Sequence, residues 1–385
     1  MMRILTTLYY YRPHYSGLTV YTERLARALA RRGHQVTVLT SRYDPSLPVR
    51  ERQDGVEIRR LPVALRLSKG VIMPAAAYWG PRLASSHDVV HVHVPQLDAA
   101  PLAAWSRLFG RPVVMTYHSN LRLPPSPVNW LASQASHLAD RWTASSAQVV
   151  VANTFDYATS TPLLRRHLRK LIVVPPPVEM PPVEARMVAQ LRRRLGVRRG
   201  QRLIGMAARL ASEKGVEILA QAMPAILSQM PTARVVYVGQ HLDVMGEEPY
   251  ARRLAPLIAR LGDRWTFLGA LSPAEMSAFY ALCDVTVLPS LNSTESFGMV
   301  QVESMICGTP VVASDLPGVR EPTLVTGMGL RTPAGDPARL AEAVLRVLDN
   351  PRRYRRDPAQ IAAWFSSERA AEQYEEIFLA LLRRR

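Results

Sequence analysis

The chain has 385 residues, of which 48% are apolar, so two domains are expected and a disordered chain is excluded. Forty-eight lysines and arginines against 31 aspartates and glutamates leave a formal charge of +17, which suggests an anionic partner: nucleic acid, a phosphorylated substrate or an acidic membrane face. The two cysteines, Cys283 and Cys307, are too few for a disulfide scaffold or a four-thiolate zinc site. No apolar run approaches the roughly 20 residues that span a bilayer, and Met1–Leu5 is too short for a signal peptide, so we expect a cytoplasmic protein.

Short β-branched runs alternate with helical patterns in the first half of the chain. A strand at Arg3–Leu8, a helix at Thr19–Arg32 and a strand at Gln35–Thr40 predict a β-α-β unit, with Gly33 as the left-handed residue that ends the helix. The strands show little polar alternation, which is typical of parallel sheets covered by helices on both faces, so the predicted fold class is α/β. The further strands expected in this half are Val56–Arg60, Val89–Val94, Pro112–Tyr117, Gln148–Val151 and Leu171–Val174.

Five prolines between Val173 and Pro182 rule out a helix or a central strand and predict a stiff linker at residues 176–182. The alternation restarts after it, so we predict two doubly wound, Rossmann-like domains at residues 1–175 and 183–364. The strands expected in the second domain are Leu203–Ala208, Arg234–Val238, Trp265–Leu268, Val285–Leu288 and Pro310–Ala313, and its helices include Gly215–Met230 and Pro273–Leu282. A last helix from Ser366 to Leu382 carries an apolar face that must dock on another element.

The segment Pro289–Glu303 holds two carboxylates eight residues apart. Glu295 precedes a predicted helix, Phe297–Ile306, and Glu303 lies inside it on nearly the same side. The free backbone N–H groups at such a helix start form an anion site. A solvated helix face with two acids fits the same spacing, so the segment alone leaves both interpretations open.

The sequence Glu295-Ser-Phe-Gly-Met-Val-Gln-Val-Glu303, which follows a strand and Leu-Pro-Ser, resembles the Glu-x7-Glu signature of the retaining glycosyltransferases of family 4. Arg209 and Lys214, just past the first strand of the second half, resemble the diphosphate clamp of that family, and Gly17 lies where the family has a glycine-rich loop. The resemblance covers essentially the full chain. It implies the GT-B fold, in which two Rossmann-like domains face each other across a cleft and the C-terminal helix (366–385) crosses back to the N-terminal domain.

The resemblance also implies a role for each site residue. Arg209 and Lys214 would neutralise the leaving diphosphate, Glu303 would bind the ribose, and Glu295 and His118 would contact the transferred hexose. The donor-binding residues implied by the family are Gly17, Phe297, Gly298, Met299, Val300 and Glu303. The match has departures: Ala208 stands where the family has a glycine, and the loop that begins at Gln240 lacks the usual second glycine.

Three histidines follow or lie in predicted strands of the first half, and a lone histidine is usually structural. His118 ends a predicted strand, where ligand contacts occur in open α/β sheets, and its place in the family motif favours a functional role. His91 and His93 alternate on one face of a buried strand, and the pair suggests a metal site. No carboxylate or thiol is spaced to join them, so we interpret them as structural or as supporting a neighbouring residue.

The expected activity is retaining transfer of a hexose from a UDP- or GDP-linked sugar to a hydroxyl acceptor, with a membrane lipid as one candidate. No Asp-x-Asp occurs in the sequence, so we expect no metal at the site and no cofactor. A nucleotide-sugar epimerase of the same fold is the alternative. A nucleic-acid-binding protein is a weaker one, since only the charge favours it and no recognition motif is present.

The segment Leu65–Trp79 is predicted to be amphipathic and to lie at a membrane interface. We therefore expect peripheral association with the anionic inner face of the cell membrane, strengthened by the net charge. The apolar residues on which this prediction rests are Leu67, Val71, Ile72, Met73, Tyr78 and Trp79, and the basic ones are Arg66 and Lys69. Basic runs elsewhere, such as residues 50–60 and 192–199, are individually typical of solvated surface.

Overall fold

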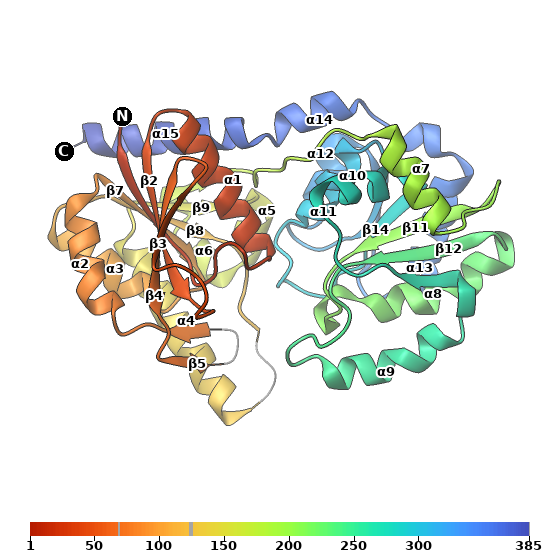
Figure 1. Cartoon of the computed structure of the whole chain (residues 1–385), viewed down its shortest axis with the longest axis horizontal. Helices are drawn as coiled ribbons and strands as arrows, with labels where there is room; N and C mark the ends of the chain where they lie inside the picture. Colours follow the sequence, from red (N-terminus) through yellow and green to blue (C-terminus); the bar gives the residue numbers. More distant parts are fainter. Residues whose placement is uncertain (68–69, 123–125, 385) are drawn as a thin grey trace. The chain divides into compact units, whose positions relative to one another are not determined.

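A computed structural model describes residues 1–67, 70–122 and 126–384, with the backbone alone for Leu67 (Figure 1). The chain divides into two compact units. The first unit comprises Met1–Pro177 and the segment that begins at Phe365, and the second comprises Val178–Trp364. Each unit is built on a largely parallel sheet with helices, so the predicted α/β class is confirmed.

An eight-stranded sheet forms the centre of the first unit. All of its strand pairs are parallel except that between β3 and β4. Every strand predicted in this half forms, with its ends shifted by at most two residues. In sheet order the strands are β10 (Leu171–Val173), β9 (Val149–Ala152), β8 (Val113–Tyr117), β7 (Val89–Val94), β1 (Arg3–Thr7), β2 (Gln35–Arg42), β4 (Val56–Pro62) and β3 (Arg50–Gln53).

The C-terminal helix α15 (Ser367–Arg383) packs against α1 (Gly17–Arg31), as expected from the family resemblance. Tyr374 is fully buried and its hydroxyl lies 2.8 Å from that of Tyr21 in α1. At the surface Arg32 pairs with Glu368 and Glu375. The apolar face predicted for this helix is therefore its docking face. The other helices of the unit are α2 (Ala76–Ser86), α3 (Ala99–Leu108), α4 (Pro127–Ser146), α5 (Phe155–Ser160) and α6 (Pro162–Arg165).

The prediction of an interfacial segment at Leu65–Trp79 is wrong in part. Strands β5 (Leu65–Leu67) and β6 (Gly70–Ile72) form a hairpin, and Val71 and Met73 are 1% and 3% exposed in the core of the first unit. Sequence reasoning missed this because a short run of apolar residues does not show which ones face inward. Ile72, Tyr78 and Trp79 do remain exposed, whereas Lys69 lies outside the described residues. Among the residues that the structure describes, no helix is both long and apolar enough to cross a bilayer.

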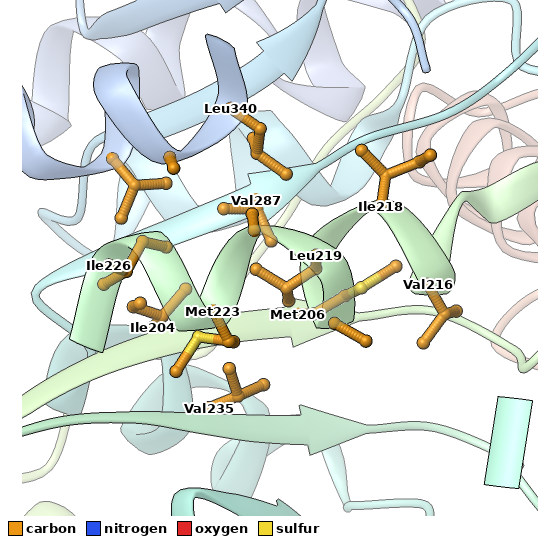
Figure 2. Close-up of a cluster of buried hydrophobic side chains, with 14 of the residues drawn as sticks. Ile204, Met206, Val216, Ile218, Leu219, Met223, Ile226, Val235, Val287 and Leu340 are labelled. Atoms are coloured by element: carbon orange, nitrogen blue, oxygen red, sulfur yellow. The ribbon is translucent and has the colours of Figure 1, made fainter. Parts of the chain in front are cut away.

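A six-stranded parallel sheet forms the centre of the second unit. Helix α8 covers one face of it, with Leu219, Met223 and Ile226 directed toward β11 and β12 (Figure 2). In sheet order the strands are β13 (Trp265–Phe267), β12 (Ala233–Val238), β11 (Arg202–Ala207), β14 (Val285–Leu288), β15 (Val311–Ser314) and β16 (Gly329–Thr332). Its α-helices are α7 (Ala185–Arg194), α8 (Val216–Gln229), α9 (Glu248–Ala259), α10 (Pro273–Leu282), α11 (Met299–Ile306), α12 (Glu321–Thr326), α13 (Pro337–Asp349) and α14 (Pro358–Trp364).

Candidate active site

Two loops of the second unit meet at the carboxyl edge of its sheet. Strands β11 and β14 are hydrogen-bonded neighbours, so the loops that follow them, residues 208–215 and 289–298, emerge side by side. The amide N–H of Leu291 donates to the carbonyl of Glu213 at 2.9 Å and ties the loops together. These two loops carry five predicted site residues: Arg209, Lys214, Glu295, Phe297 and Gly298.

Lys214 and Glu295 form an ion pair between these loops. The Lys214 Nζ lies 2.6 Å from the Glu295 Oε2, and the two side chains are only 23% and 17% exposed. Arg209 pairs with Glu213 at 3.1 Å and is more open to solvent. Each basic residue predicted to bind phosphate therefore already has a carboxylate partner, which an incoming anion would have to replace.

Glu303 lies inside helix α11, which begins after Gly298. The hydroxyl of Tyr280 donates to the Glu303 Oε2 at 3.1 Å. Gly298 has a φ of +79°, and a Cβ there would lie 2.3 Å from the Leu288 side chain, so this helix start requires glycine. Phe297, predicted to bind the donor, is only 2% exposed as a whole residue, so its role in donor binding stays a prediction.

Sequence reasoning missed the residues that shape the loop of residues 208–215, which is predicted to bind phosphate. Gly215 has a φ of +66°, and a Cβ there would lie 2.0 Å from the carbonyl oxygen of Pro289. Gly239 has a φ of +126°, and a Cβ there would lie 2.1 Å from the Ala208 carbonyl. The carboxylate of Glu247 accepts a hydrogen bond from the Ser212 N–H at 3.0 Å. Gly215 and Gly239 can both be read in the sequence after a predicted strand. The sequence does not show that the backbone of Pro289 or Ala208 approaches them closely enough to require glycine.

His118 directly follows β8 in the first unit and is 8% exposed. Its Nε2 lies 2.7 Å from the Nδ1 of His93, whose Nε2 lies 3.0 Å from the Thr6 hydroxyl. The ring of Tyr21 meets His118 edge to face, with centroids 4.7 Å apart. Burial lowers the pKa of His118 to about 3, so the imidazole is neutral at physiological pH.

Gly17 is the first residue of α1 and is exposed. The Ser16 side chain caps this helix by accepting from the Thr19 N–H. Tyr21, one turn further along α1, contacts His118, so the start of this helix and His118 belong to one neighbourhood of the first unit. The donor-binding role of Gly17 stays a prediction.

His91 and His93 belong to a buried polar chain rather than to a metal centre. His91 bonds to the Thr116 hydroxyl at 2.7 Å, and Thr116 bonds to the Tyr374 hydroxyl at 2.6 Å. Within the described ranges no group of three or more His, Cys, Asp or Glu side chains could hold a metal ion. His91, through Thr116, connects the sheet to the C-terminal helix. His93 holds the His118 ring by a hydrogen bond between the two imidazoles.

We predict that His91→Gln makes stability less sensitive to acid. Burial lowers the pKa of His91 to about 3, below the usual value of about 6.5, and repulsion between the two rings when His118 is also protonated adds to this. The unfolded chain therefore takes up a proton that the folded chain does not, and stability that is complete above about pH 6.5 is lost as the pH falls toward 3. Between pH 7.5 and 4.5 the wild type should lose about 2–3 kcal/mol more unfolding free energy than the variant.

Urea unfolding of both proteins at the two pH values measures this difference. Comparing the two proteins cancels the opposite contribution of Asp98 and Asp140, whose pKa values burial raises to about 6 and about 7. Equal losses in the two proteins would show that His91 is protonated as readily in the folded chain as in the unfolded one.

Comparison with known proteins agrees with this geometry. Residues 16–182 match the family described as "Glycosyl transferase 4-like domain", and residues 201–350 match "Glycosyl transferases group 1". A D-inositol 3-phosphate glycosyltransferase from Acidothermus cellulolyticus is 32% identical over 86% of this chain and 78% of its own. A 2-deoxystreptamine N-acetyl-D-glucosaminyltransferase from Streptomyces fradiae is 30% identical over 89% of this chain and 85% of its own.

Solved structures show the same fold at lower identity. HepE from Anabaena in complex with UDP-glucose superposes with a TM-score of 0.77 at 22% identity, covering 99% of this chain and all of that one. Sucrose-phosphate synthase from Thermosynechococcus elongatus gives 0.78 at 21% identity, with both chains fully covered. The fold is therefore that of the GT-B glycosyltransferases. This chain belongs to glycosyltransferase family 4. The epimerase alternative finds no support in these relatives.

Proposed function

We propose that this glycosyltransferase moves a hexose from a UDP- or GDP-linked sugar to a hydroxyl acceptor with retention of anomeric configuration. The observation that carries the proposal is the Lys214–Glu295 contact at 2.6 Å, with Arg209 in the same loop as Lys214 and with α11 beginning directly after the loop of Glu295. A cation and a carboxylate held together at the edge of a sheet provide one group for a phosphate and one for sugar hydroxyls. The UDP-glucose bound to HepE supports a nucleotide-sugar donor.

We propose that Lys214 and Arg209 exchange their carboxylate partners for the phosphates of the donor when it binds. Arg209, Lys214, Glu213, Glu295 and Glu303 together carry a formal charge of −1, so the ligand-free site does not attract a diphosphate by net charge. A phosphate that accepts hydrogen bonds from Lys214 and Arg209 would release Glu295, which could then accept hydrogen bonds from the hexose. The N–H groups at the start of α11 add stabilisation to the phosphates.

The transfer breaks the bond between the anomeric carbon and the phosphate oxygen and forms one to the acceptor oxygen. In same-face attack the acceptor proton passes to the departing phosphate oxygen, so no separate base is required. Lys214 and Arg209 act by stabilising charge that grows on the phosphate as the bond breaks. A neutral His118 can hydrogen-bond a hexose hydroxyl without competing for the proton.

Glu303→Ala is expected to weaken binding of the free nucleoside diphosphate by about 1–3 kcal/mol, since a carboxylate that accepts ribose hydroxyl hydrogen bonds would be lost. Titration calorimetry measures the affinity. Tyr280→Phe is the matched control, because it removes the hydrogen bond from the Tyr280 hydroxyl to Glu303 and keeps the carboxylate. Unchanged affinity in a folded Glu303→Ala protein would remove Glu303 from the donor site.

Activity is expected to survive EDTA. The proposal assigns the diphosphate charge to Lys214 and Arg209, and the sequence has no Asp-x-Asp to hold a divalent cation between phosphates. Initial rates before and after dialysis against the chelator provide the test. Loss of activity that Mg²⁺ or Mn²⁺ restores would contradict the assignment.

The acceptor is proposed to be a polyhydroxylated ring. D-inositol 3-phosphate and 2-deoxystreptamine, which appear in the names of two relatives, are both such rings, and they support this class. A lipid acceptor is the second candidate, favoured by exposed Ile72, Tyr78 and Trp79 and by the charge of +17. Radiolabelled donor with inositol phosphates in one arm and anionic liposomes in the other decides between them by the fraction that carries the label.

A further inference from the structure

A pocket of about 760 Å³ lies in the first unit, and none of the residues that line it is assigned to the sugar donor. It opens at the amino ends of β1 and β2, where Arg3 and Gln35 are the first strand residues, and α2 forms its other wall. His118 follows the carboxyl end of β8 in the same sheet, so the pocket and His118 lie at opposite edges of that sheet. Its volume is within the usual range for small-molecule sites.

The lining is strongly basic. Five arginines against Glu51 and Glu57 leave a formal charge of +3. The pairing of Glu51 with Arg60 and of Arg3 with Asp88 adds one charge of each sign from outside the lining and leaves this total unchanged. We call this cavity the arginine pocket; its arginines are Arg3, Arg50, Arg52, Arg59 and Arg82.

The arginines of the pocket outnumber the carboxylates that pair with them. Arg50 on β3 lies directly across from Arg59 on β4, an arrangement that disfavours the strand pair unless an anion lies between them. Glu57 alone serves both, at 3.2 Å and 2.5 Å. In the described part of the chain no carboxylate lies within ion-pair distance of Arg52 or Arg82, and Arg82 instead stacks on Tyr78.

One part of the pocket wall is apolar and neutral. Trp79, Leu83 and Val36 line it, with the Arg59 guanidinium over the Trp79 ring. His87 bonds to the Leu83 carbonyl at 2.7 Å and the Thr37 hydroxyl at 2.9 Å, and burial lowers its pKa, so it adds no charge. An organic group could pack on this wall while its anionic substituents meet the arginines.

We propose that the arginine pocket binds a phosphate-bearing molecule at a site separate from the donor site. The guanidinium groups lie on β3, β4 and α2. A phosphate, which has several oxygens, can accept hydrogen bonds from more of them than a single carboxylate can. The phosphate belongs either to a soluble oligophosphate or to the headgroup of an anionic lipid. Both sources present the same chemistry to the five arginines.

Titration calorimetry with tripolyphosphate tests the proposal on the full chain. The variant Arg50→Gln/Arg52→Gln/Arg82→Gln is expected to bind at least tenfold more weakly than wild type. The control Arg192→Gln/Arg193→Gln/Arg198→Gln removes the same charge from exposed positions of the second unit and should change affinity less than twofold. If the triple pocket variant unfolds, Arg52→Gln alone should weaken binding about threefold, since Arg52 has no ion pair to lose in the described residues.

Lys214→Ala separates this site from the donor site. Tripolyphosphate binding that survives Lys214→Ala and falls in the pocket variant supports the proposal, whether or not transferase activity is ever found. Binding lost in Lys214→Ala and kept in the pocket variant overturns it. Co-sedimentation with phosphatidylcholine vesicles, with and without phosphatidylinositol 4-phosphate, then identifies the source: pelleting that requires the pocket arginines indicates the lipid, and absence of pelleting alongside calorimetric binding indicates the soluble ligand.

Discussion

Replacing Lys214 by alanine should lower kcat about 100- to 1000-fold while changing KM much less. The ammonium group lies 2.6 Å from Glu295 in the ligand-free chain and is proposed to move to the leaving phosphate, where negative charge grows in the transition state. An interaction that strengthens only in the transition state appears in kcat. Steady-state kinetics with the identified donor measures both constants.

Three further variants make this prediction specific. Lys214→Arg keeps the charge and should retain more activity than the alanine variant. Arg209→Ala should have a smaller effect because that side chain is more exposed, and the double alanine variant should be less than additive if both cations bind one phosphate. If both single alanine variants have wild-type kcat and KM, the diphosphate is not bound where we place it.

Gly215→Ala should distort the loop of residues 208–215, which carries Arg209 and Lys214. A Cβ at this position would lie 2.0 Å from the Pro289 carbonyl oxygen, and the φ of +66° is itself unfavourable for alanine. We expect the free energy of unfolding to fall by about 1–3 kcal/mol and the activity to fall as steeply as in Lys214→Ala, since the loop must shift to remove the clash. Denaturant unfolding and kcat/KM on the same preparation provide the two measurements.

Gly196→Ala is the matched control for this variant. Gly196 has a similar φ of +59°, but no atom lies within 4 Å of the position of its added Cβ. It should therefore show the cost of the backbone conformation alone, with activity close to wild type. Equal losses of activity in the two alanine variants would mean that the close approach of Gly215 to Pro289 does not position Lys214.

The sequence predicted the parts of the fold that local patterns encode. Helix α10 occurs at the predicted residues because Ser272 caps its start and Pro273 is its first residue, both of which are readable from the chain. The elements that were missed depend on distant partners. Strand β3 is a charged edge strand that only its pairing with β4 defines, and the Gly329–Thr332 strand lies at the far edge of its sheet with little apolar pattern.

The residues of the candidate site could be predicted from the sequence, but their contacts could not. The loops that carry Arg209, Lys214 and Glu295 could be named because each follows a predicted strand, but their contact depends on β11 and β14 being neighbours in the sheet. The support of His118 by His93 and Thr6 likewise depends on the order of three strands that are distant in sequence. The predicted roles of these residues came from the family resemblance, whereas their contacts could be seen only once the order of the strands in each sheet was known.

The measurement that tests the central claim most directly is the NMR spectrum of the first product. The chain would be incubated with UDP- and GDP-hexoses of α configuration and with inositol phosphate, and the anomeric proton of the new glycoside would be recorded before any secondary reaction. We predict a transferred hexose with the larger one-bond C1–H1 coupling of an α-linkage, formed from one of these donors. This coupling separates the two anomers of manno-configured as well as gluco-configured hexoses. A β-linked first product would contradict retention, and an epimerised donor with no glycoside would contradict the transferase site built around Lys214 and Glu295.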